Sequence, residues 1–454
     1  MVNPPNRLRI KRSQAWILML VWFFVVMLVG SLTFVFLLWV LSPPSGAPGN
    51  QPGIADVDTT PTPTLTPTPF VPPPPIEDPA NGGSTPGASP SEFVPAAPPP
   101  PAWDRDRFAY GIELRLEFIP EQTLDMVDQI ELSWVKQQIR WEFYERSEGQ
   151  IEWDLLDAYF AALDGRNKYV LLSFNAAPDW AVAEPVDGAE SPPEDAEDLA
   201  RFIGAMLLRY PGQIHAVEVW NEPNLAREWT SPEGLSADDY VDLLATASET
   251  VRTIDPSIIV ISAGLSPTGV DDGVRAIEDT RYLQDMIAAG ALDHVDCVGV
   301  HHNGFNLPPD VAWDDDLTDD AAVFQGPFTD PHPSWSFEST ISGANQIVQD
   351  AGSNTPLCVT EFGWATAEDM DGSPTDAYAF ALDNTLDEQA EWIVEAFNSL
   401  RDRPYVQMAF LFNLDFSPKV GGDPQEDTAL YSLLTPNGGP RPAFEALRDM
   451  PKFD

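Results

Sequence analysis

Eight short apolar runs alternate with amphipathic helical patterns between residues 103 and 454, and this alternation constrains the fold more than any other feature. The expected strands are Phe108–Ile112, Val135–Arg140, Tyr169–Phe174, Ala216–Trp220, Ile258–Ala263, Cys297–His301, Leu357–Glu361 and Val406–Phe412. The helical patterns between them include Leu155–Leu163, Leu199–Leu207, Tyr240–Val251, Tyr282–Ala289, Ala344–Val348 and Glu388–Leu400. Several strands are apolar throughout, which is typical of a parallel sheet covered on both faces. Eight strand–helix repeats in roughly 350 residues predict an α/β fold, a (β/α)8 TIM barrel with its site at the carboxyl ends of the strands.

A doubly wound open sheet is the alternative arrangement of the same elements. Such a sheet commonly binds a dinucleotide through a Gly-x-Gly-x-x-Gly turn after its first strand. No such turn follows Phe108–Ile112. The barrel is therefore the preferred prediction for residues 103–454.

An uninterrupted apolar run without any charge covers residues 16–41. At about 1.5 Å per residue it is roughly 39 Å long, which exceeds the roughly 30 Å hydrocarbon core of a bilayer. Residues 1–15 are basic, so the positive-inside rule places them in the cytoplasm and everything after the run outside. The prediction is a single-pass cell-membrane protein that contacts the lipid bilayer through residues 16–41, and a buried core helix is the alternative.

Residues 42–102 hold nearly half of the chain's 46 prolines, in runs such as Thr60-Pro61-Thr62-Pro63. A segment of this composition cannot bury a core and favours extended polyproline II conformations. We expect a disordered linker that holds residues 103–454 away from the membrane.

The chain has a net charge of −47. Binding to nucleic acid requires a basic surface, so this charge argues against a nucleic-acid partner. The two cysteines both lie in expected strands, Cys297 four residues before His301 and Cys358 three residues before Glu361. With the strand period of two, they point to opposite sides if His301 and Glu361 both face inward. The expectation is two buried free thiols.

Two glutamates end predicted strands, Glu222 after a Trp-Asn pair and Glu361 before Phe-Gly-Trp. Two carboxylates at the ends of parallel strands are what cleavage of a glycosidic bond requires, one as the acid and one as the nucleophile or base. Hydrophobic surroundings would raise the pKa of the one that serves as acid. The alternative is that each is a structural carboxylate that binds a helix N-terminus.

Several segments carry a resemblance to a known group of enzymes. They are Trp220–Asn224, Thr360–Trp364, Trp141–Trp153 with Asp157 after it, Pro178–Trp180, and a C-terminal stretch with Tyr431–Leu434, Gly438 and Pro442–Phe444. In this order they resemble clan A of the retaining glycoside hydrolases, the cellulase, β-xylosidase and related (β/α)8 enzymes. The resemblance covers about Phe108 to Leu447.

This resemblance implies a role for individual residues. Glu222 corresponds to the acid/base, Glu361 to the nucleophile, and Asn221 to the amide that contacts the sugar 2-hydroxyl. His301 matches a histidine near the catalytic pair. Further substrate-binding candidates, near the rim of the barrel, are Arg140, Trp180 and Trp364. No metal and no organic cofactor is implied.

Three positions depart from the clan's pattern. Asn303 stands where a tyrosine commonly orients the nucleophile, and Lys136 stands in the slot of the strand-two arginine. The last strand lacks the usual tryptophan, so Phe412 or Phe416 would have to form the floor under the sugar.

The sequence thus predicts a membrane-anchored, extracytoplasmic glycosidase. It would cleave O-glycosidic bonds of a poly- or oligosaccharide by double displacement with retention. Two alternatives use the same barrel: a carbohydrate-binding surface protein with weakened chemistry, and an envelope transglycosylase in which a sugar replaces water as acceptor.

Overall fold

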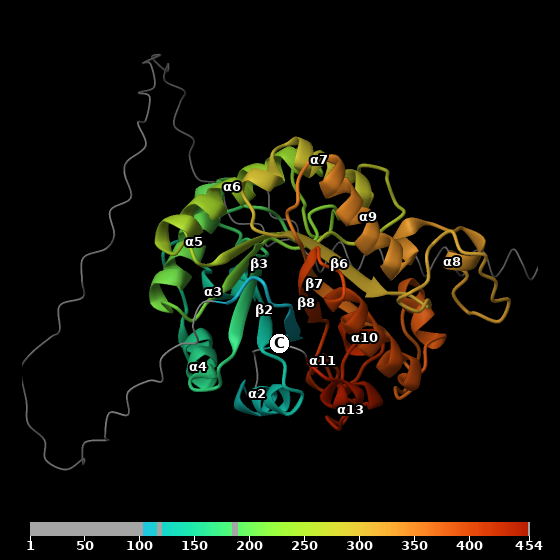
Figure 1. The fold of residues 1–454 in the computed structure, drawn as a ribbon. Helices are drawn as coiled ribbons and strands as arrows, with labels where there is room; N and C mark the ends of the chain where they lie inside the picture. The colour runs from blue at the N-terminus through green and yellow to red at the C-terminus, as the bar shows by residue number, and fades with distance from the viewer. Residues whose placement is uncertain (1–102, 116–119, 184–188, 453–454) are drawn as a thin grey trace, which may run out of the picture. The chain divides into compact units, whose positions relative to one another are not determined.

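A parallel sheet of eight strands forms the centre of the structure (Figure 1). The structure, a computed structural model, describes residues 103–115, 120–183 and 189–452. The strands are β1 (Ala109–Leu114), β2 (Trp134–Arg140), β3 (Tyr169–Asn175), β4 (Ala216–Val219), β5 (Ile259–Ser262), β6 (Val298–Gly304), β7 (Leu357–Trp364) and β8 (Val406–Leu411). Every strand predicted from the sequence is present, and no strand end differs from its predicted position by more than three residues.

The sheet closes into a barrel. Its strand order is β5-β4-β3-β2-β1-β8-β7-β6, and every pair in this order is parallel. The two outer strands meet through a parallel bridge between Ile261 and Cys297. Asp296 N also donates to Val260 O over 2.8 Å at this seam. The predicted (β/α)8 barrel is therefore confirmed for the described part of the chain, and the open sheet is not formed.

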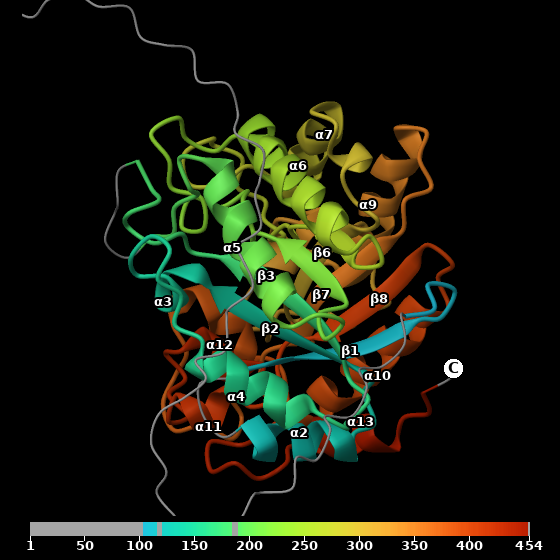
Figure 2. The same ribbon diagram turned by 90° about the vertical axis from the view of Figure 1, so that its left-hand side faces the viewer.

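The longer helices lie outside the strands, as Figures 1 and 2 show. They are α2 (Pro120–Gln129), α4 (Asp154–Leu163), α5 (Ala196–Arg209), α6 (Ala237–Ile254), α7 (Asp279–Ala288), α9 (Phe337–Asp350), α10 (Leu386–Arg401) and α13 (Pro442–Asp449). Capping residues fix where several of them begin. Asp195 and Ser236 accept hydrogen bonds from the first turns of α5 and α6, and Thr385 and Glu388 form a capping box on α10.

Short helices occupy the connecting loops. They are α3 (Trp141–Tyr144), η1 (Ala291–Asp293), α8 (Gly326–Thr329), η2 (Pro333–Trp335), η3 (Asp376–Leu382), α11 (Phe416–Lys419) and α12 (Asp427–Leu430). The loop after β6 is long and carries α8 out to the side of the barrel (Figure 1).

Apolar side chains fill one end of the barrel interior. The cluster consists of Ala109, Trp134, Leu171, Ala216, Ile259, Ile261, Cys297, Cys358, Met408 and Phe410. Trp103 packs edge-on against Trp134 and Tyr169, with ring centroids 5.5 and 4.8 Å apart. This packing closes the amino-terminal end, so the polar interior side chains lie toward the carboxyl ends of the strands.

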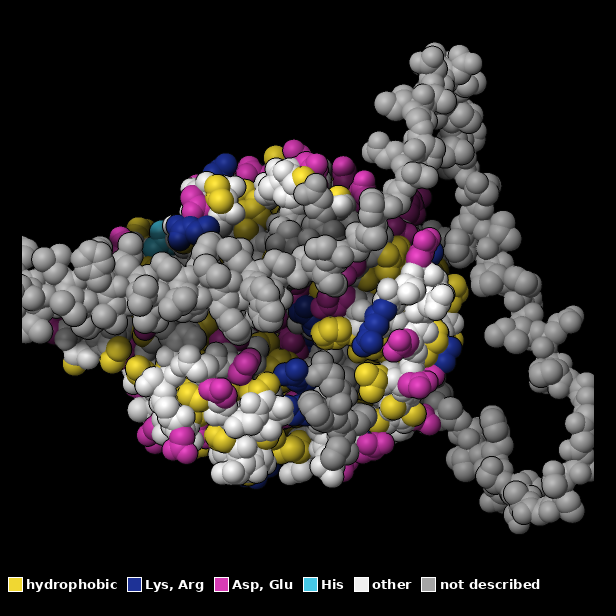
Figure 3. Space-filling model, turned by 180° about the vertical axis from the view of Figure 1, so that it is seen from behind, with side chains coloured by type: hydrophobic (Ala, Val, Ile, Leu, Met, Phe, Trp, Pro, Cys, Tyr) yellow, Lys and Arg dark blue, Asp and Glu magenta, His cyan; other side chains and the backbone are white. Residues whose placement is uncertain are grey.

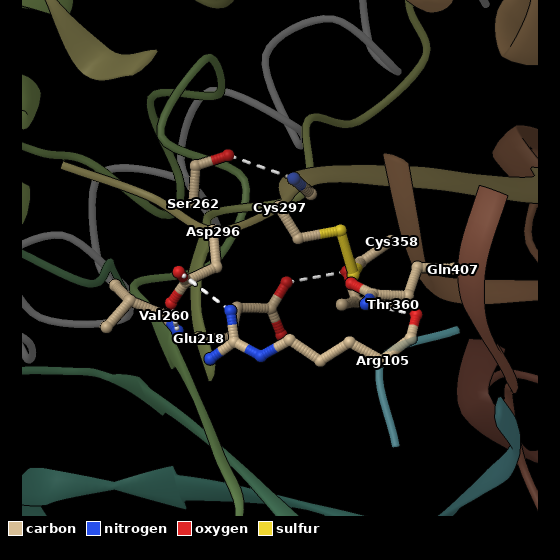
Figure 4. Close-up of a disulfide and its surroundings, with 10 residues drawn as sticks. Arg105, Glu218, Val260, Ser262, Asp296, Cys297, Cys358, Thr360 and Gln407 are labelled. Atoms are coloured by element: carbon tan, nitrogen blue, oxygen red, sulfur yellow. Dashed lines mark hydrogen bonds and ion pairs between the residues drawn. A yellow bond between two sulfur atoms is a disulfide. The ribbon is translucent and has the colours of Figure 1, made fainter. Parts of the chain in front are cut away.

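The prediction of two free thiols is wrong, because Cys297 and Cys358 form a disulfide with Cα atoms 5.8 Å apart (Figure 4). The reason is a β-bulge in β7. Val300 pairs with Val359 and His301 pairs with Glu361, so Thr360 is an extra residue that has no partner on β6. The extra residue resets the alternation of side chains, and Cys358 faces the barrel interior as Glu361 does.

No helix in the described ranges is both long and apolar enough to span a bilayer. The predicted span 16–41, like the linker 42–102, lies outside the described residues. On the face of the barrel seen in Figure 3, Asp and Glu side chains are scattered among Lys and Arg side chains.

Candidate active site

Glu222 and Glu361 reach the same end of the barrel from β4 and β7. β4 ends at Val219, and the following turn has positive φ at Trp220 (74°) and Glu222 (40°). Glu222 N donates to Gly264 O over 3.1 Å, which fixes this turn to the segment after β5. Positive φ is costly for residues with a side chain, and such positions cluster at functional sites.

His301 brings the two carboxylates together. Its Nδ1 lies 3.3 Å from Glu222 Oε1 and 3.9 Å from Glu361 Oε2. The histidine is fully buried, and both glutamates are 6% exposed. A Cβ on Gly264 would lie 2.0 Å from His301 Cδ2, so only glycine leaves room for the ring. The predicted association of these three residues is therefore observed.

Both oxygens of Glu361 accept hydrogen bonds. Lys136 Nζ donates to Oε1 over 2.7 Å, and Asn303 Nδ2 donates to Oε2 over 3.2 Å. Lys136 and Asn303 occupy the positions that depart from the clan's pattern. The structure thus supplies a cation and a neutral donor where arginine and tyrosine are usual. The two donors hold the carboxyl group of Glu361 in one orientation.

A layer of buried charged residues below the pair was not predicted from the sequence. Lys136 Nζ lies 3.1 Å from Glu113 Oε2 and 3.4 Å from Glu218 Oε2, and all three side chains are at most 2% exposed. Thr360 Oγ1 donates to Glu218 Oε1 over 2.6 Å. The signal in the sequence was a single charged residue in each of two otherwise largely apolar strands, Glu113 in β1 and Glu218 in β4.

The groups of this layer differ in protonation. Burial raises the pKa of Glu113 to about 8 despite Lys136. Burial would also raise the pKa of Glu218, but Lys136 and His301 outweigh it and lower that pKa to about 2. Burial opposes the charge of His301, yet Glu361 and the hydrogen bonds to Glu218 and Glu222 raise its pKa to about 10. At neutral pH Glu113 is therefore protonated, Glu218 is a carboxylate and His301 is a cation.

Glu222 is held in its ionised form, contrary to the expectation that apolar surroundings raise the pKa of the acid. Burial acts in the expected direction, but the hydrogen bond from His301 and the charge of Arg227 lower the pKa of Glu222 to about 2. Arg227 Nη2 lies 3.0 Å from Glu222 Oε2. Sequence reasoning missed Arg227 because it lies five residues after Glu222, in a loop with no strand or helix period.

Two of the predicted substrate contacts are engaged with protein groups. Asn221 Nδ2 donates to Glu228 Oε2 over 3.3 Å, and its buried Oδ1 has no hydrogen-bond partner among the residues that the structure describes. Arg140 pairs with Glu142 and Glu190 at the end of β2. Arg140 is therefore occupied by carboxylates of the neighbouring segments, Glu142 in α3 and Glu190 in the loop after β3.

The two tryptophans named as substrate-binding candidates, Trp180 and Trp364, differ in their surroundings. Trp180 is half-buried, and its Nε1 donates to Glu145 O over 2.7 Å. Trp364 is completely buried, and its Nε1 donates to Leu307 O over 2.9 Å. The ring of Trp364 is enclosed by protein in this structure, which favours a core residue over a substrate contact.

Aromatic side chains also approach the pair from the loops after β7 and β8. Half-buried Phe412 packs edge-on against Tyr431 and Phe416, each with centroids 5.6 Å away. Burial raises the pKa of Tyr378 and of Tyr431, and the charge of Glu222 acts on both in the same direction. Phe412 and Phe416 are the two residues considered from the sequence as a floor for the sugar, and the two tyrosines were not predicted.

The sequence matches no protein-family model and no curated protein. Its fold, however, is similar to that of many solved structures. One is a family 39 glycoside hydrolase from the gut symbiont Bacteroides cellulosilyticus WH2, with a TM-score of 0.54 and 18% identity. The alignment covers 77% of this chain and 64% of that one.

Two further neighbours have similar scores. A monomeric β-xylosidase from Caulobacter crescentus CB15 has a TM-score of 0.52 and 19% identity over 78% of this chain and 69% of that one. A glucosidase from Croceicoccus marinus has a TM-score of 0.51 and 13% identity over 76% and 67%. At these identities the likeness establishes the barrel and leaves the chemistry to the residues of the site.

Proposed function

We propose that residues 103–454 hydrolyse O-glycosidic bonds of a poly- or oligosaccharide by a retaining mechanism, with Glu361 as nucleophile and Glu222 as acid/base. The observation that carries this proposal is that one nitrogen of His301 lies within 3.9 Å of both carboxylates. Retaining enzymes hold their two carboxyl groups about 5–5.5 Å apart, and a shared neighbour of this kind fits a short separation. The glycosidase names of the structural neighbours support the same reaction class.

The residues fit the two steps of double displacement. In the first step a Glu361 oxygen forms a bond to the anomeric carbon while the bond to the leaving oxygen breaks and Glu222 gives that oxygen a proton. In the second step Glu222 takes a proton from water, whose oxygen displaces Glu361 from the anomeric carbon. Lys136 and Asn303 orient Glu361 and stabilise its charge before the attack and after its release.

Placement outside the cytoplasm is part of the proposal. It rests on the apolar run 16–41 and the basic residues before it. The Cys297–Cys358 disulfide supports it, since disulfides form and persist in oxidising compartments. Anchoring would be tested by fractionating cells that express the full chain and by protease access to the barrel from outside.

A carbohydrate-binding protein with lost chemistry is the second candidate, and the resting pair of Glu222 with Arg227 favours it. Hydrolysis of a panel of aryl glycosides, beginning with xylosides and glucosides, separates the two. We expect the full chain to hydrolyse at least one member and the Glu361→Gln variant to lose at least about 1,000-fold in rate. Equal rates in the two proteins would refute the assignment, and binding without hydrolysis would favour the second candidate.

The acceptor distinguishes hydrolysis from transglycosylation, which uses the same residues. Product analysis with a sugar acceptor in excess is the test. Free sugar as the main product supports hydrolysis, and a new glycoside as the main product supports the transglycosylase alternative.

A further inference from the structure

Arg227 lies between two glutamates and contacts both. Its Nη2 is 3.0 Å from Glu222 Oε2, and its Nε is 3.3 Å from Glu228 Oε1. The Arg227 side chain is 57% exposed, whereas the side chains of Glu222 and Glu228 are 8% and 15% exposed. A guanidinium has several donors in a fixed fork, so a small movement exchanges one carboxylate for the other.

In this arrangement Glu222 has no free oxygen for a substrate. Arg227 contacts Oε2, and His301 Nδ1 lies 3.3 Å from Oε1. An acid catalyst must instead carry a proton and reach the leaving oxygen within about 2.6–3.2 Å. Since His301 is fully buried and Arg227 is exposed, Arg227 is the partner that has room to leave.

Hydrogen bonds hold Glu228 in position beside the Arg227 guanidinium. Asn221 Nδ2 donates to its Oε2 over 3.3 Å, and its own backbone oxygen accepts from Trp220 Nε1 over 2.9 Å. The segment is therefore fixed against the turn that carries Glu222. Burial raises the pKa of Glu228 to about 8, with contributions from the charges of Glu190 and Glu222. Glu228 thus holds a proton at neutral pH while Glu222 does not.

We propose that Arg227 exchanges between Glu222 and Glu228, so that the proton stored on Glu228 in the free protein is carried by Glu222 when substrate is bound. In the free protein Glu228 is protonated and the Arg227 cation balances the Glu222 carboxylate. In the working state Glu228 is ionised and pairs with Arg227, and Glu222 is protonated. One O–H bond is broken on Glu228 and one is formed on Glu222, through solvent at the exposed guanidinium. The net charge of the three groups is unchanged, so the exchange requires no additional ion.

The charge balance explains why the two glutamates are linked. Ionised Glu222 is one of the causes that keep the proton on Glu228. Protonation of Glu222 removes that charge, which favours ionisation of Glu228 and strengthens the existing contact of Arg227 with Glu228. Arg227 and Glu228 are positioning residues in this scheme, because they act through Glu222.

Other ionisable groups face the trio and set the background of any titration. Those that act on the trio directly are His301 from β6, Glu190 from the loop after β3, Tyr378 from η3 and Tyr431 after α12. Glu218 and Glu361 act through His301, and Asp427 acts through the two tyrosines. Their presence is common to the wild-type protein and its variants, so differences between variants report on the trio.

This inference rests on the proposed function, and two variants of the full chain test it. Glu228→Gln cannot ionise, so Arg227 stays on Glu222. For a glycoside with a poor leaving group we expect kcat/KM to fall about 100-fold, within the range that general acid catalysis contributes. A dinitrophenyl glycoside needs no acid, and its rate should change less than about 3-fold. For the glycoside with the poor leaving group, the alkaline limb of the plot of kcat/KM against pH should move to lower pH.

Arg227→Gln should act in the opposite direction. It frees Glu222 from the charge that lowers its pKa, so the alkaline limb of the kcat/KM profile for the poor leaving group moves to higher pH. The matched controls are Glu233→Gln on the same loop and Arg275→Gln, an exposed arginine paired with Asp272. Neither control variant should shift the alkaline limb of the kcat/KM profile. Because Arg227 is exposed, its variant tests the proposal even if Glu228→Gln does not fold.

A readout that needs no activity separates this inference from the proposed function. In isotope-edited infrared spectra at pH 7, Glu228→Gln should lose one protonated-carboxyl band that the wild type has. If both variants move the limb in the same direction, or if the band is unchanged, the exchange is wrong. If the band is lost but the wild type hydrolyses no glycoside, the proposed function fails and the stored proton on Glu228 stands.

Discussion

Lys136 Nζ lies 2.7 Å from Glu361 Oε1 and is completely buried, so the candidate nucleophile is joined to a cation inside the barrel. The same ammonium contacts Glu113 and Glu218. The burial of one lysine among three carboxyl groups ties the stability of the barrel to the charge of the site.

Replacement of Lys136 by methionine should therefore affect stability as well as activity. Methionine fills the volume but leaves the Glu218 and Glu361 carboxylates without their cation. Removing one partner of a buried ion pair costs about 3–5 kcal/mol. Urea denaturation of the variant should show a loss of this size, and Lys136→Arg, which retains the charge, should lose less. A stability equal to that of the wild type would contradict the buried network.

Asn303 provides the second donor to Glu361. Asn303→Asp retains the shape, removes the donor and adds a like charge, so kcat should fall by about 100-fold or more, as when one stabilising donor is lost. Asn303→Tyr restores a donor of the kind that the clan carries and should be less impaired. Steady-state kinetics on the best aryl glycoside measure this. If Asn303→Asp retained full kcat, Asn303 would have no role in orienting the nucleophile.

The raised pKa values of Glu113 and His301 should make stability fall as pH rises from about 4.5 to 10. His301 has a raised pKa of about 10 in the folded protein, so its contribution is present below about 6.5 and is lost as pH rises toward 10. Glu113 has a raised pKa of about 8, so the unfolded chain releases that proton first and stability falls between about 4.5 and 8.

Thermal unfolding of Glu113→Gln across this range provides the check. The amide cannot titrate, so the fall between about pH 4.5 and 8 should be shallower than in the wild type. Identical slopes would mean that Glu113 does not retain its proton in the folded barrel.

The disulfide links Cys297, directly before β6, to Cys358 in β7, and this cross-link should stabilise the folded barrel. Its sequence separation of 61 residues corresponds to about 4 kcal/mol in the chain-entropy description. We expect the double variant Cys297→Ala/Cys358→Ala to unfold at a correspondingly lower denaturant concentration. Alkylation of the unfolded wild type without reductant should label no thiol, and labelling of both cysteines would show that the bond is absent in the isolated protein.

The repeating pattern of the sequence predicted the elements that position the site. Continuous apolar strands separated by helical patterns predict the barrel, and the carboxyl ends of β4 and β7 then bring Glu222 and Glu361 to one rim. Lys136 and His301 were found because resemblance and strand period both place them on the inner face. These inferences succeed because regular strands and helices produce a periodic pattern of apolar residues in the sequence.

The failures arise where geometry is irregular or where contacts join distant loops. The bulge at Thr360 reverses the facing of Cys358, and no period in the sequence marks the extra residue. Arg227 meets Glu222 through a loop, so the lowered pKa of Glu222 was not foreseen. Trp364 follows a predicted strand end, but the aromatic core behind β7 buries it completely.

Covalent labelling of the nucleophile tests the central claim most directly. A 2-deoxy-2-fluoro glycoside with a dinitrophenyl leaving group should form a stable glycosyl-protein, because the fluorine slows both steps whereas the activated leaving group accelerates only the first. Peptide mapping by mass spectrometry should find one added sugar, on Glu361, and Glu361→Gln should not be labelled. A label on another residue, or hydrolysis that inverts the anomeric configuration without any label, would contradict the assignment of Glu361 as nucleophile.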